Sequence, residues 1–373
     1  MSNPDTPLLG LNVVELSERG SAAYAGKCLR RLGANLIKVE PPGGDPLRYS
    51  ESKVHRQGKR VTTAAFDYFN EGKSSIAFED PEQLAGLIEG VDAFILDIEL
   101  HRYPSYGLNP ETLAEAGALV TCAITPFGLT GPYRDFSGPE LVTSAFGGMT
   151  VGIGEPGRPP LRMPLMQTAI QGGLVAAIAA MGALAGSNQP SGLVVDVAET
   201  DVWATIHAGT TMVSFLFSNR LRRREGRRVL GQPYPHQIFR CKDGFIAMQG
   251  SERHQYEQFL EMVGSPEWAQ DRRFGSRLEM NTKHADEIDE LLAPWFMART
   301  REEIFSECRR RQIPAAPAYS VDEVRVHPAM AERQVLETYT GATGVPVTVP
   351  APPFRFRNAS LAPPGPVPNL EGE

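Results

Sequence analysis

Short apolar runs alternate with helical patterns through the first half of the chain. Leu11–Leu16 has the apolar pattern of a buried strand, Ala22–Leu32 that of a helix ending at Gly33, and Ala34–Val39 that of a second strand. A strand, a helix and a strand within about 30 residues form a βαβ unit with parallel strands. The alternation continues with strands at Ser74–Phe78, Ala93–Asp97 and Ala118–Ile124 and helices at Pro81–Glu89 and Pro110–Ala116. This order predicts an α/β fold with an open, Rossmann-like parallel sheet.

The middle of the chain contains a helix built almost entirely of small and aliphatic residues. Gln171–Ala185 is rich in Gly and Ala, which indicates close packing in a core or at a subunit contact. Its most apolar part, Leu174–Ala185, is shorter than the roughly 20 residues that span a bilayer, so no membrane association is expected. A strand at Leu193–Val197 and a long helix at Ala198–Leu216 follow.

A smaller domain of a different style is expected next. The stretch Arg220–Arg228 carries many arginines and is either a solvated connector or a loop that faces an anion. A hairpin follows, with Asp243-Gly244 as its turn. The hairpin strands are predicted at His236–Cys241 and Phe245–Gln249, and helices at Glu252–Val263, His284–Ala298 and Arg301–Arg311.

The proline-rich tail from Pro346 onward is expected to run extended back over the first domain. We therefore predict a large domain at residues 1–219, a smaller α+β domain at 220–325, and a C-terminal segment at 326–373 that returns to the large domain.

Charge and composition exclude several classes of protein. The net charge is -7, with 37 Lys and Arg against 44 Asp and Glu, whereas a nucleic-acid-binding protein needs a basic excess. The four cysteines are far apart and the seven histidines show no HxxH or HExxH spacing, so no metal site is expected. The N-terminus lacks the basic and apolar regions of a signal peptide, and a cytoplasmic location is expected.

Common catalytic and nucleotide-binding motifs are missing. The segment after the first strand is Ser17-Glu18-Arg19-Gly20-Ser21, which is not the G-x-G-x-x-G of a nicotinamide-binding dehydrogenase. The sequence also contains neither a GxxxxGK[ST] phosphate loop nor the G-x-S-x-G of an esterase.

Several segments, in order, resemble the class III CoA-transferases, the family of formyl-CoA transferase, carnitine CoA-transferase and α-methylacyl-CoA racemase. They are LNVVELS followed by YAGKCLRRLGANLIKVEPPGGDPLR, then NEGKSSIAF, ITPFGLTGPYRD, VVDVAETD, YPHQIFRCKDGFIAM and RTREEIFSECRRRQIPAAPAYSVDEV. The resemblance implies a Rossmann-like large domain, a smaller α/β domain, and two subunits that thread through each other as an interlocked dimer.

The resemblance also implies a nucleophilic aspartate that attacks the acyl-CoA thioester. The family places this aspartate just before a helix of the form G-x-x-A-A, and aligning Gly173 and Ala176-Ala177 on that pattern puts Ala169 at the nucleophile position. A methyl group cannot form the mixed anhydride that the reaction requires. No Asp or Glu occurs between Glu155 and Asp196, so a shift of the alignment does not supply the carboxylate.

A second candidate for chemistry is Glu140. The racemase branch of the family uses a His in a G-H-D element, and the corresponding segment here is Gly138-Pro139-Glu140. Glu140 could act as a general base if burial raises its pKa. The alternative is a surface or helix-capping glutamate.

The resemblance places the CoA site on the loops after the strands. The candidate CoA-binding residues are Gly20, Ser21, Phe78, Asp97, Ile98 and Arg102. An acidic group at Asp97 would oppose the phosphates of CoA, while Arg102 and Arg48 are possible phosphate partners. Lys38 and Lys73 match the family pattern, and their alternative role is structural pairing with acids such as Glu40.

Three functions follow from these observations. The first is a subunit of a heteromeric CoA-transferase whose partner supplies the aspartate. The second is a lyase, dehydratase or epimerase that acts on an acyl-CoA with acid–base groups such as Glu140 or His236. The third is a non-enzymatic binding or scaffolding relative. The first two take CoA or an acyl-CoA as substrate, with no tightly bound cofactor, and the protein is expected to be a homodimer or a heteromer.

Overall fold

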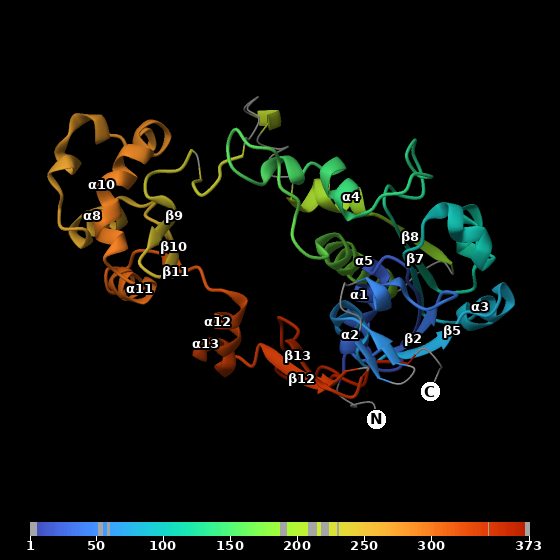
Figure 1. Cartoon of the computed structure of the whole chain (residues 1–373). Coiled ribbons are helices and arrows are strands. Elements are labelled where there is room, and N and C mark those ends of the chain that lie inside the picture. The colour runs from blue at the N-terminus through green and yellow to red at the C-terminus, as the bar shows by residue number, and fades with distance from the viewer. Residues whose placement is uncertain are drawn as a thin grey trace. The chain divides into compact units, whose positions relative to one another are not determined.

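The computed structural model describes residues 6–50, 55–57, 60–186, 192–207, 215–217, 224–229, 231–341 and 343–369. The chain divides into two compact units (Figure 1). The larger unit contains residues 1–151, 162–222 and 329–373, and the smaller unit contains residues 152–161 and 223–328. The short segment 152–161 thus belongs with the smaller unit although the sequence before and after it belongs to the larger.

A six-stranded parallel sheet forms the centre of the larger unit, in the order β5-β2-β1-β6-β7-β8. Its strands are β1 (Asn12–Leu16), β2 (Asn35–Glu40), β5 (Ser74–Ala77), β6 (Ala93–Leu96), β7 (Val120–Thr125) and β8 (Leu193–Ala198). The inner strands β6 and β7 are buried along their whole length and are mainly apolar, as expected for a parallel sheet covered on both faces. The predicted α/β class and parallel sheet are confirmed.

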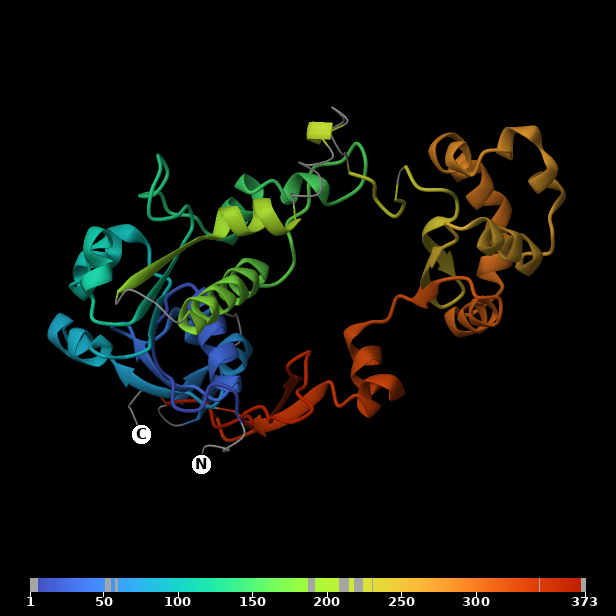
Figure 2. The ribbon, with the colours of Figure 1, turned by 180° about the vertical axis from the view of Figure 1, so that it is seen from behind.

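Helices cover both faces of this sheet (Figure 2). One face packs on α1 (Ser21–Arg31) and α5 (Gln167–Ala185), and the other on α3 (Pro81–Ile88) and the 3-10 helices η2 (Leu100–Tyr106) and η3 (Pro110–Glu115). The predicted helix at Pro110–Ala116 is thus a 3-10 helix. The remaining elements of the first part are η1 (Pro46–Tyr49), β3 (His55–Gln57), β4 (Arg60–Thr62), α2 (Ala64–Asn70), α4 (Glu140–Phe146), η4 (Thr150–Gly152), α6 (Glu199–Val202) and a π-helical turn η5 (Trp203–His207).

Helix α5 is longer than its sequence pattern indicated. It begins at Gln167, has 19 residues, and is the one helix in the described residues that is long and apolar enough to cross a membrane by length and composition. Its small residues Ala176 and Ala177 are buried in the same apolar cluster as Ala22 and Ala25 of α1. A core helix passes the same test, and the packing on α1 is that of a core helix.

The predicted long helix Ala198–Leu216 differs in the structure. Residues 199–207 are helical but change from α to π at Trp203, and residues 215–217 are helical. Residues 208–214 lie outside the described part of the chain.

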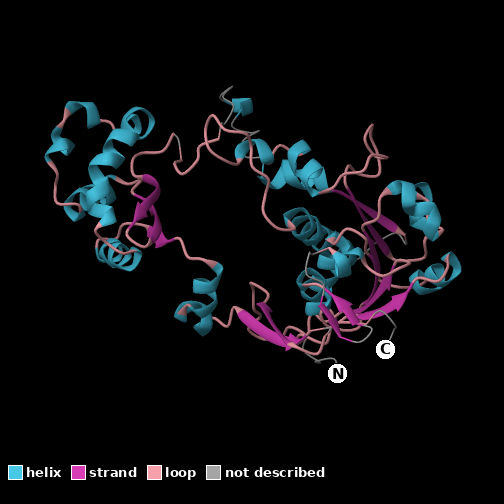
Figure 3. Cartoon of the chain, in the orientation of Figure 1, coloured by secondary structure: helices cyan, strands magenta, loops and turns pink. Residues whose placement is uncertain are grey.

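The smaller unit is a three-stranded antiparallel sheet with helices packed on one face (Figure 3). The predicted hairpin is present as β9 (His236–Cys241) and β10 (Gly244–Gln249), and β11 (Ala315–Pro317) adds a third strand. The helices are α8 (Arg253–Met262), η6 (Glu267–Gln270), η7 (Arg272–Phe274), α9 (Arg277–Glu279), η8 (Met280–His284), α10 (Ala285–Met297), α11 (Arg301–Arg310) and α12 (Val321–Val326).

The C-terminal segment packs on the larger unit. After α13 (Pro328–Glu332), strands β12 (Leu336–Thr340) and β13 (Pro346–Pro350) form a hairpin that was not predicted. Beyond it, the Gly365 N–H donates to Glu71 and the Arg30 guanidinium to the Pro363 carbonyl. These contacts hold residues 363–365 against α1 and the end of α2.

Candidate functional site

The loop after β1 lies at the point where the sheet order reverses. From β1 the chain first builds β2 and β5 on one side and then returns to place β6 on the other side. In open parallel sheets, ligands bind at the carboxyl ends of the strands at such a switch point.

The switch point is filled by the carboxylate of Asp97, which follows β6 and is fully buried. It accepts hydrogen bonds from the backbone N–H groups of Glu18 at 2.7 Å, Arg19 at 3.1 Å and Ala22 at 2.8 Å, and from the Ser17 hydroxyl at 2.9 Å. Burial raises the pKa of Asp97 to about 7 although these donors favour the ionised form. The N–H groups that often bind a phosphate in related folds thus hold a carboxylate of the same chain.

Arg19 joins four loops at this edge. Its guanidinium donates to Glu199 and to the Gly138 carbonyl, both at 2.6 Å, and to Glu99 at 3.1 Å. The buried Glu199 also accepts a hydrogen bond of 2.6 Å from the Ser21 hydroxyl. Since both oxygens of Glu199 are held, one by Arg19 and the other by Ser21, this residue serves to fix the loops rather than to react.

Ala169 lies at the start of α5 and faces the Gly20 loop. Its side chain is 5% exposed. A Cβ atom on Gly20 would lie 3.5 Å from the Ala169 Cβ and 3.2 Å from the Met166 Cε, and Gly20 has a φ of 98° that favours glycine. Gly20 and Ala169, neither of which has a reactive side chain, therefore face each other.

Glu140 forms a hydrogen bond through its carboxyl group with the backbone directly before Ala169. It is the first residue of α4, is half-buried, and accepts the Thr168 N–H at 3.3 Å. Burial is the main cause that raises the pKa of Glu140, and the Glu199 carboxylate adds to it, while the N–H groups of Thr168 and Gln167 lower it. The predicted capping role is present, although on the neighbouring helix α5, and the raised pKa is also what a general base would need.

The other candidate CoA-binding residues gather around Tyr106. Phe78 packs edge-on against the Tyr106 ring with centroids 4.9 Å apart, and the Arg102 guanidinium lies 6.0 Å from the same centroid. Arg102 is 45% exposed and pairs with Glu18 at 2.8 Å. Ile98 is fully buried in the apolar cluster that Phe78 also contacts. The structure thus gathers the candidate residues into two groups. One group is Gly20, Ser21, Glu140 and Ala169, and the other is Phe78, Ile98 and Arg102.

The cations of the sequence pattern in and after the second strand and at residue 73 form buried ion pairs. Lys38 pairs with Glu15 at 2.9 Å and Asp45 at 2.6 Å, and Lys73 pairs with Glu15 at 2.6 Å. Arg48 is 1% exposed and pairs with Glu40. Structural pairing is the role of both lysines, with Glu15 rather than Glu40 as the main partner. Arg48 has no surface to offer a phosphate, which corrects that expectation.

Sequence reasoning missed Arg19, Glu199 and Trp203 as parts of the site. The Trp203 indole N–H donates to the Thr168 hydroxyl at 3.0 Å, directly before Ala169. A signal was present for Glu199, because it directly follows a strand in the segment VVDVAETD. Nothing in the sequence pairs it with Arg19, 180 positions away.

His236 and the described end of the arginine-rich stretch, residues 224–228, belong to the smaller unit. His236 is the first residue of β9. Arg227 and Arg228 pair with Asp289 of α10, while residues 218–223 lie outside the described residues. Within the described ranges, no group of three His, Cys, Asp or Glu side chains is arranged to hold a metal ion.

An open parallel sheet with its candidate site at the switch-point edge defines an α/β protein of the kind that binds its ligand beyond the strand ends. The sequence profile of CoA-transferase family III matches residues 8–373, and the chain belongs to this family. The expectation drawn from the sequence segments is confirmed at this level.

Three known proteins illustrate the relationship. The succinate–glutarate CoA-transferase of Agrobacterium fabrum is 28% identical over 96% of this chain and 94% of its own length. The succinyl-CoA–L-malate CoA-transferase alpha subunit of Chloroflexus aurantiacus is 27% identical over 87% of this chain and 78% of its own length. The crystal structure of a CAIB/BAIF family protein from Brucella suis has a TM-score of 0.86 at 28% identity, and covers 98% of this chain and 97% of that protein.

Proposed function

We propose that this protein is one subunit of a heteromeric CoA-transferase that moves CoA between carboxylic acids. A second subunit of the same family supplies the nucleophilic aspartate, and this chain contributes its fold and subunit contacts. The observation that carries the proposal is Ala169, a buried methyl group at the start of α5 within an otherwise complete family fold.

The chemistry requires a carboxylate at that point. A carboxylate oxygen attacks the thioester carbonyl and releases CoA thiolate, which leaves an acyl anhydride on the enzyme. The thiolate then attacks the enzyme carboxyl carbon and releases the first acid. Ala169 can do neither, and the neighbouring Glu199 is held by Arg19 and Ser21.

Two further observations support an assembly of subunits. The related protein from Chloroflexus aurantiacus is named as an alpha subunit. Leu174 and Ile178 lie one turn apart and therefore on the same face of α5. They are 46% and 58% exposed. Exposed aliphatic side chains in this arrangement favour a protein partner, in keeping with the interlocked dimer that the family resemblance implies.

Mixing experiments test this proposal. The chain is purified alone and together with a CoA-transferase encoded beside it, and each preparation is given an acyl-CoA and a free acid. We expect CoA transfer and a hydroxylamine-sensitive acyl adduct only in the mixture, with the adduct on the partner. An adduct on a side chain of this chain alone would overturn the proposal.

The variant Ala169→Asp sharpens the test. Alone or in the mixture it should gain an acyl adduct at residue 169, detected by mass spectrometry after peptide digestion. Ala169→Asn, of nearly the same size but without a nucleophilic oxygen, should gain none. Equal behaviour of the two variants would show that residue 169 does not face the thioester.

A second candidate function rests on Glu140. Its raised pKa and its place beside α5 favour proton abstraction from an acyl-CoA, as in a lyase, dehydratase or epimerase. Exchange of α-protons of an acyl-CoA in heavy water, followed by NMR, checks this function. Exchange that is lost in Glu140→Gln would favour it, and no exchange by the unaltered protein would remove it.

A further inference from the structure

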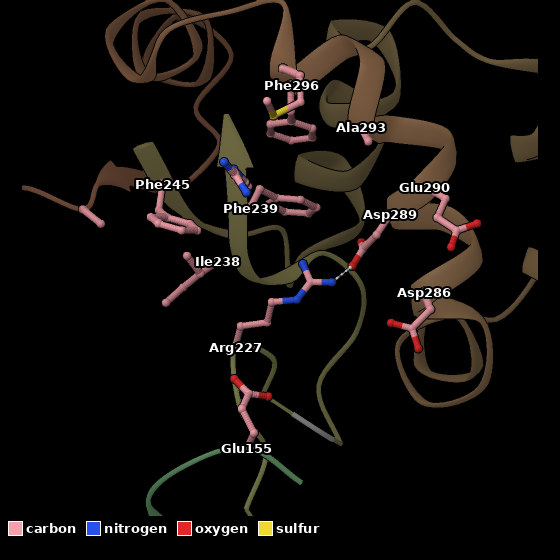
Figure 4. A pocket seen from close by; sticks show the side chains of 13 residues that line it. Glu155, Arg227, Ile238, Phe239, Phe245, Asp286, Asp289, Glu290, Ala293 and Phe296 are labelled. Carbon is pink, nitrogen blue, oxygen red and sulfur yellow. Dashed lines mark hydrogen bonds and ion pairs between the residues drawn. The ribbon is translucent and has the colours of Figure 1, made fainter. Parts of the chain in front are cut away.

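The smaller unit contains a cavity of about 800 Å³ whose walls lie entirely within that unit (Figure 4). Small-molecule sites fall in this size range and are mainly apolar with a few polar groups. The cavity lies beside β9 and β10 and reaches α10. None of the residues discussed for the larger unit contributes to it.

One wall of the cavity is an exposed apolar surface. Ile238 and Phe245 are 40% and 51% exposed, and Met297 at the end of α10 is 44% exposed. Behind them, Phe239 and Phe296 stack with ring centroids 4.4 Å apart and an interplanar angle of 5°. This wall offers a flat aromatic and aliphatic surface to a ligand with an apolar body.

Arg240 stands on the same face of the sheet as this apolar wall. Side chains two apart on a strand share a face, so Arg240 lies beside Ile238, and the β9–β10 register places Phe245 directly opposite Arg240. No carboxylate among the described residues pairs with Arg240, although it lines the cavity. Its charge is therefore available to an anion.

Of the four carboxylates that line the cavity, Asp286 and Asp289 are held in ion pairs. Asp289 accepts from Arg227 at 2.8 Å and also pairs with Arg228, which in turn holds Asp286 at 2.6 Å. The Glu155 carboxylate lies beside Arg227 in Figure 4, at the end of the cavity away from Phe245 and Phe296. Glu290 is on the far side from Ile238 in the same view. The apolar wall is thus bordered by a cation.

We propose that this cavity binds a monocarboxylic acid with an aliphatic or aromatic body. The carboxylate contacts the Arg240 guanidinium, which can hold it through two parallel hydrogen bonds, and the body packs on Ile238, Phe245 and Met297. The inference rests on the proposed function only in choosing a carboxylic acid as the anion, because the site itself is defined by this unit alone.

Calorimetric titration of the full chain with hexanoate tests the site without any turnover. We expect saturable binding that Arg240→Gln weakens about tenfold, because a charge-assisted contact is lost. Phe245→Ala should weaken it severalfold. Both residues lie on the exposed sheet face, so neither change should alter the folded state. Arg253→Gln is the matched control, since Arg253 is 90% exposed and outside the cavity, and it should bind as the unaltered protein does.

Titrations with hexylamine, 1-hexanol and acetate test which properties of the ligand the cavity recognises. Weaker binding of all three than of hexanoate supports the proposal, because each lacks either the negative charge or the apolar body. Equal or tighter binding of hexylamine would show that the carboxylates dominate the cavity and would overturn the proposal. Hexanoate binding that Arg240→Gln leaves unchanged would also overturn it. So would the absence of hexanoate binding at concentrations up to about 20 mM. Loss of CoA transfer in the mixing experiments would leave these outcomes unaffected.

Discussion

The Glu140 carboxylate accepts a hydrogen bond from the backbone N–H of Thr168, 3.3 Å away, and so ties the start of α4 to the start of α5. A carboxylate at a helix N-terminus accepts hydrogen bonds from N–H groups that have no partner within the helix, and its negative charge interacts favourably with the helix dipole. The contact fixes the residue directly before Ala169.

Replacing Glu140 separates its capping role from its charge. Glu140→Ala should lower the free energy of unfolding by about 1 kcal/mol, because a helix cap is lost, whereas Glu140→Gln retains an acceptor oxygen and should lose about half as much or less. Urea denaturation measures both. Equal stability of the alanine variant and the unaltered protein would show that the contact does not hold α5.

The stability of the protein should also depend on pH through Glu140. Its folded-state pKa is raised, so the folded protein keeps a proton that the unfolded chain releases. The stability contributed by this group is therefore present at low pH and decreases as pH rises above the ordinary glutamate value. Comparing Glu140→Gln with the unaltered protein across pH 4 to 7 isolates this contribution as a difference in slope.

Removing Arg19 should be costly because it leaves Glu199 buried without its cation. We expect Arg19→Met to lower the free energy of unfolding by about 3 kcal/mol or more. Adding Glu199→Gln should recover part of the loss, since the second change removes the unpaired charge. Additive losses in the double variant would contradict the ion pair as the source of the effect.

Asp97 is expected to be a structural residue. In Asp97→Asn the amide nitrogen cannot accept from the N–H and O–H groups that surround the carboxylate, and the loss should be about 2–3 kcal/mol. Asp80→Asn is a suitable control, because Asp80 caps α3 through the Gln83 N–H and asparagine caps equally well. A mild effect of Asp97→Asn accompanied by stronger CoA binding would instead show that the carboxylate blocks an anion site.

Two glycines of α5 should respond in opposite directions to alanine. A Cβ atom at Gly173 would lie 2.3 Å from the Ser21 carbonyl oxygen, so Gly173→Ala must separate α5 from α1 and should cost at least about 2 kcal/mol. Gly182 has nothing within 4 Å of the same position, and Gly182→Ala should stabilise the helix by about 0.5–1 kcal/mol. Thermal denaturation of the two variants tests whether close packing of α1 on α5 holds the site.

The sequence alone determined the parallel sheet, the hairpin of the smaller unit and the family. These follow from local patterns: apolar runs such as the one that became β6, the Asp243-Gly244 turn, and short segments whose order is read directly along the chain. The absence of a carboxylate at residue 169 was also visible there, because it depends on residue identity and not on geometry.

Only the tertiary structure decided which polar groups meet. Arg19 and Glu199 form an ion pair although they are far apart in the sequence. Asp97 accepts hydrogen bonds from the N–H groups of a loop that lies nearly 80 positions earlier in the chain. Such contacts arise where strand ends from different parts of the chain converge at one edge of the sheet, and hydrophobic periodicity carries no information about them. The same holds for the cavity of the smaller unit, where the β9–β10 register, rather than any motif, places Arg240 beside Ile238 and Phe245.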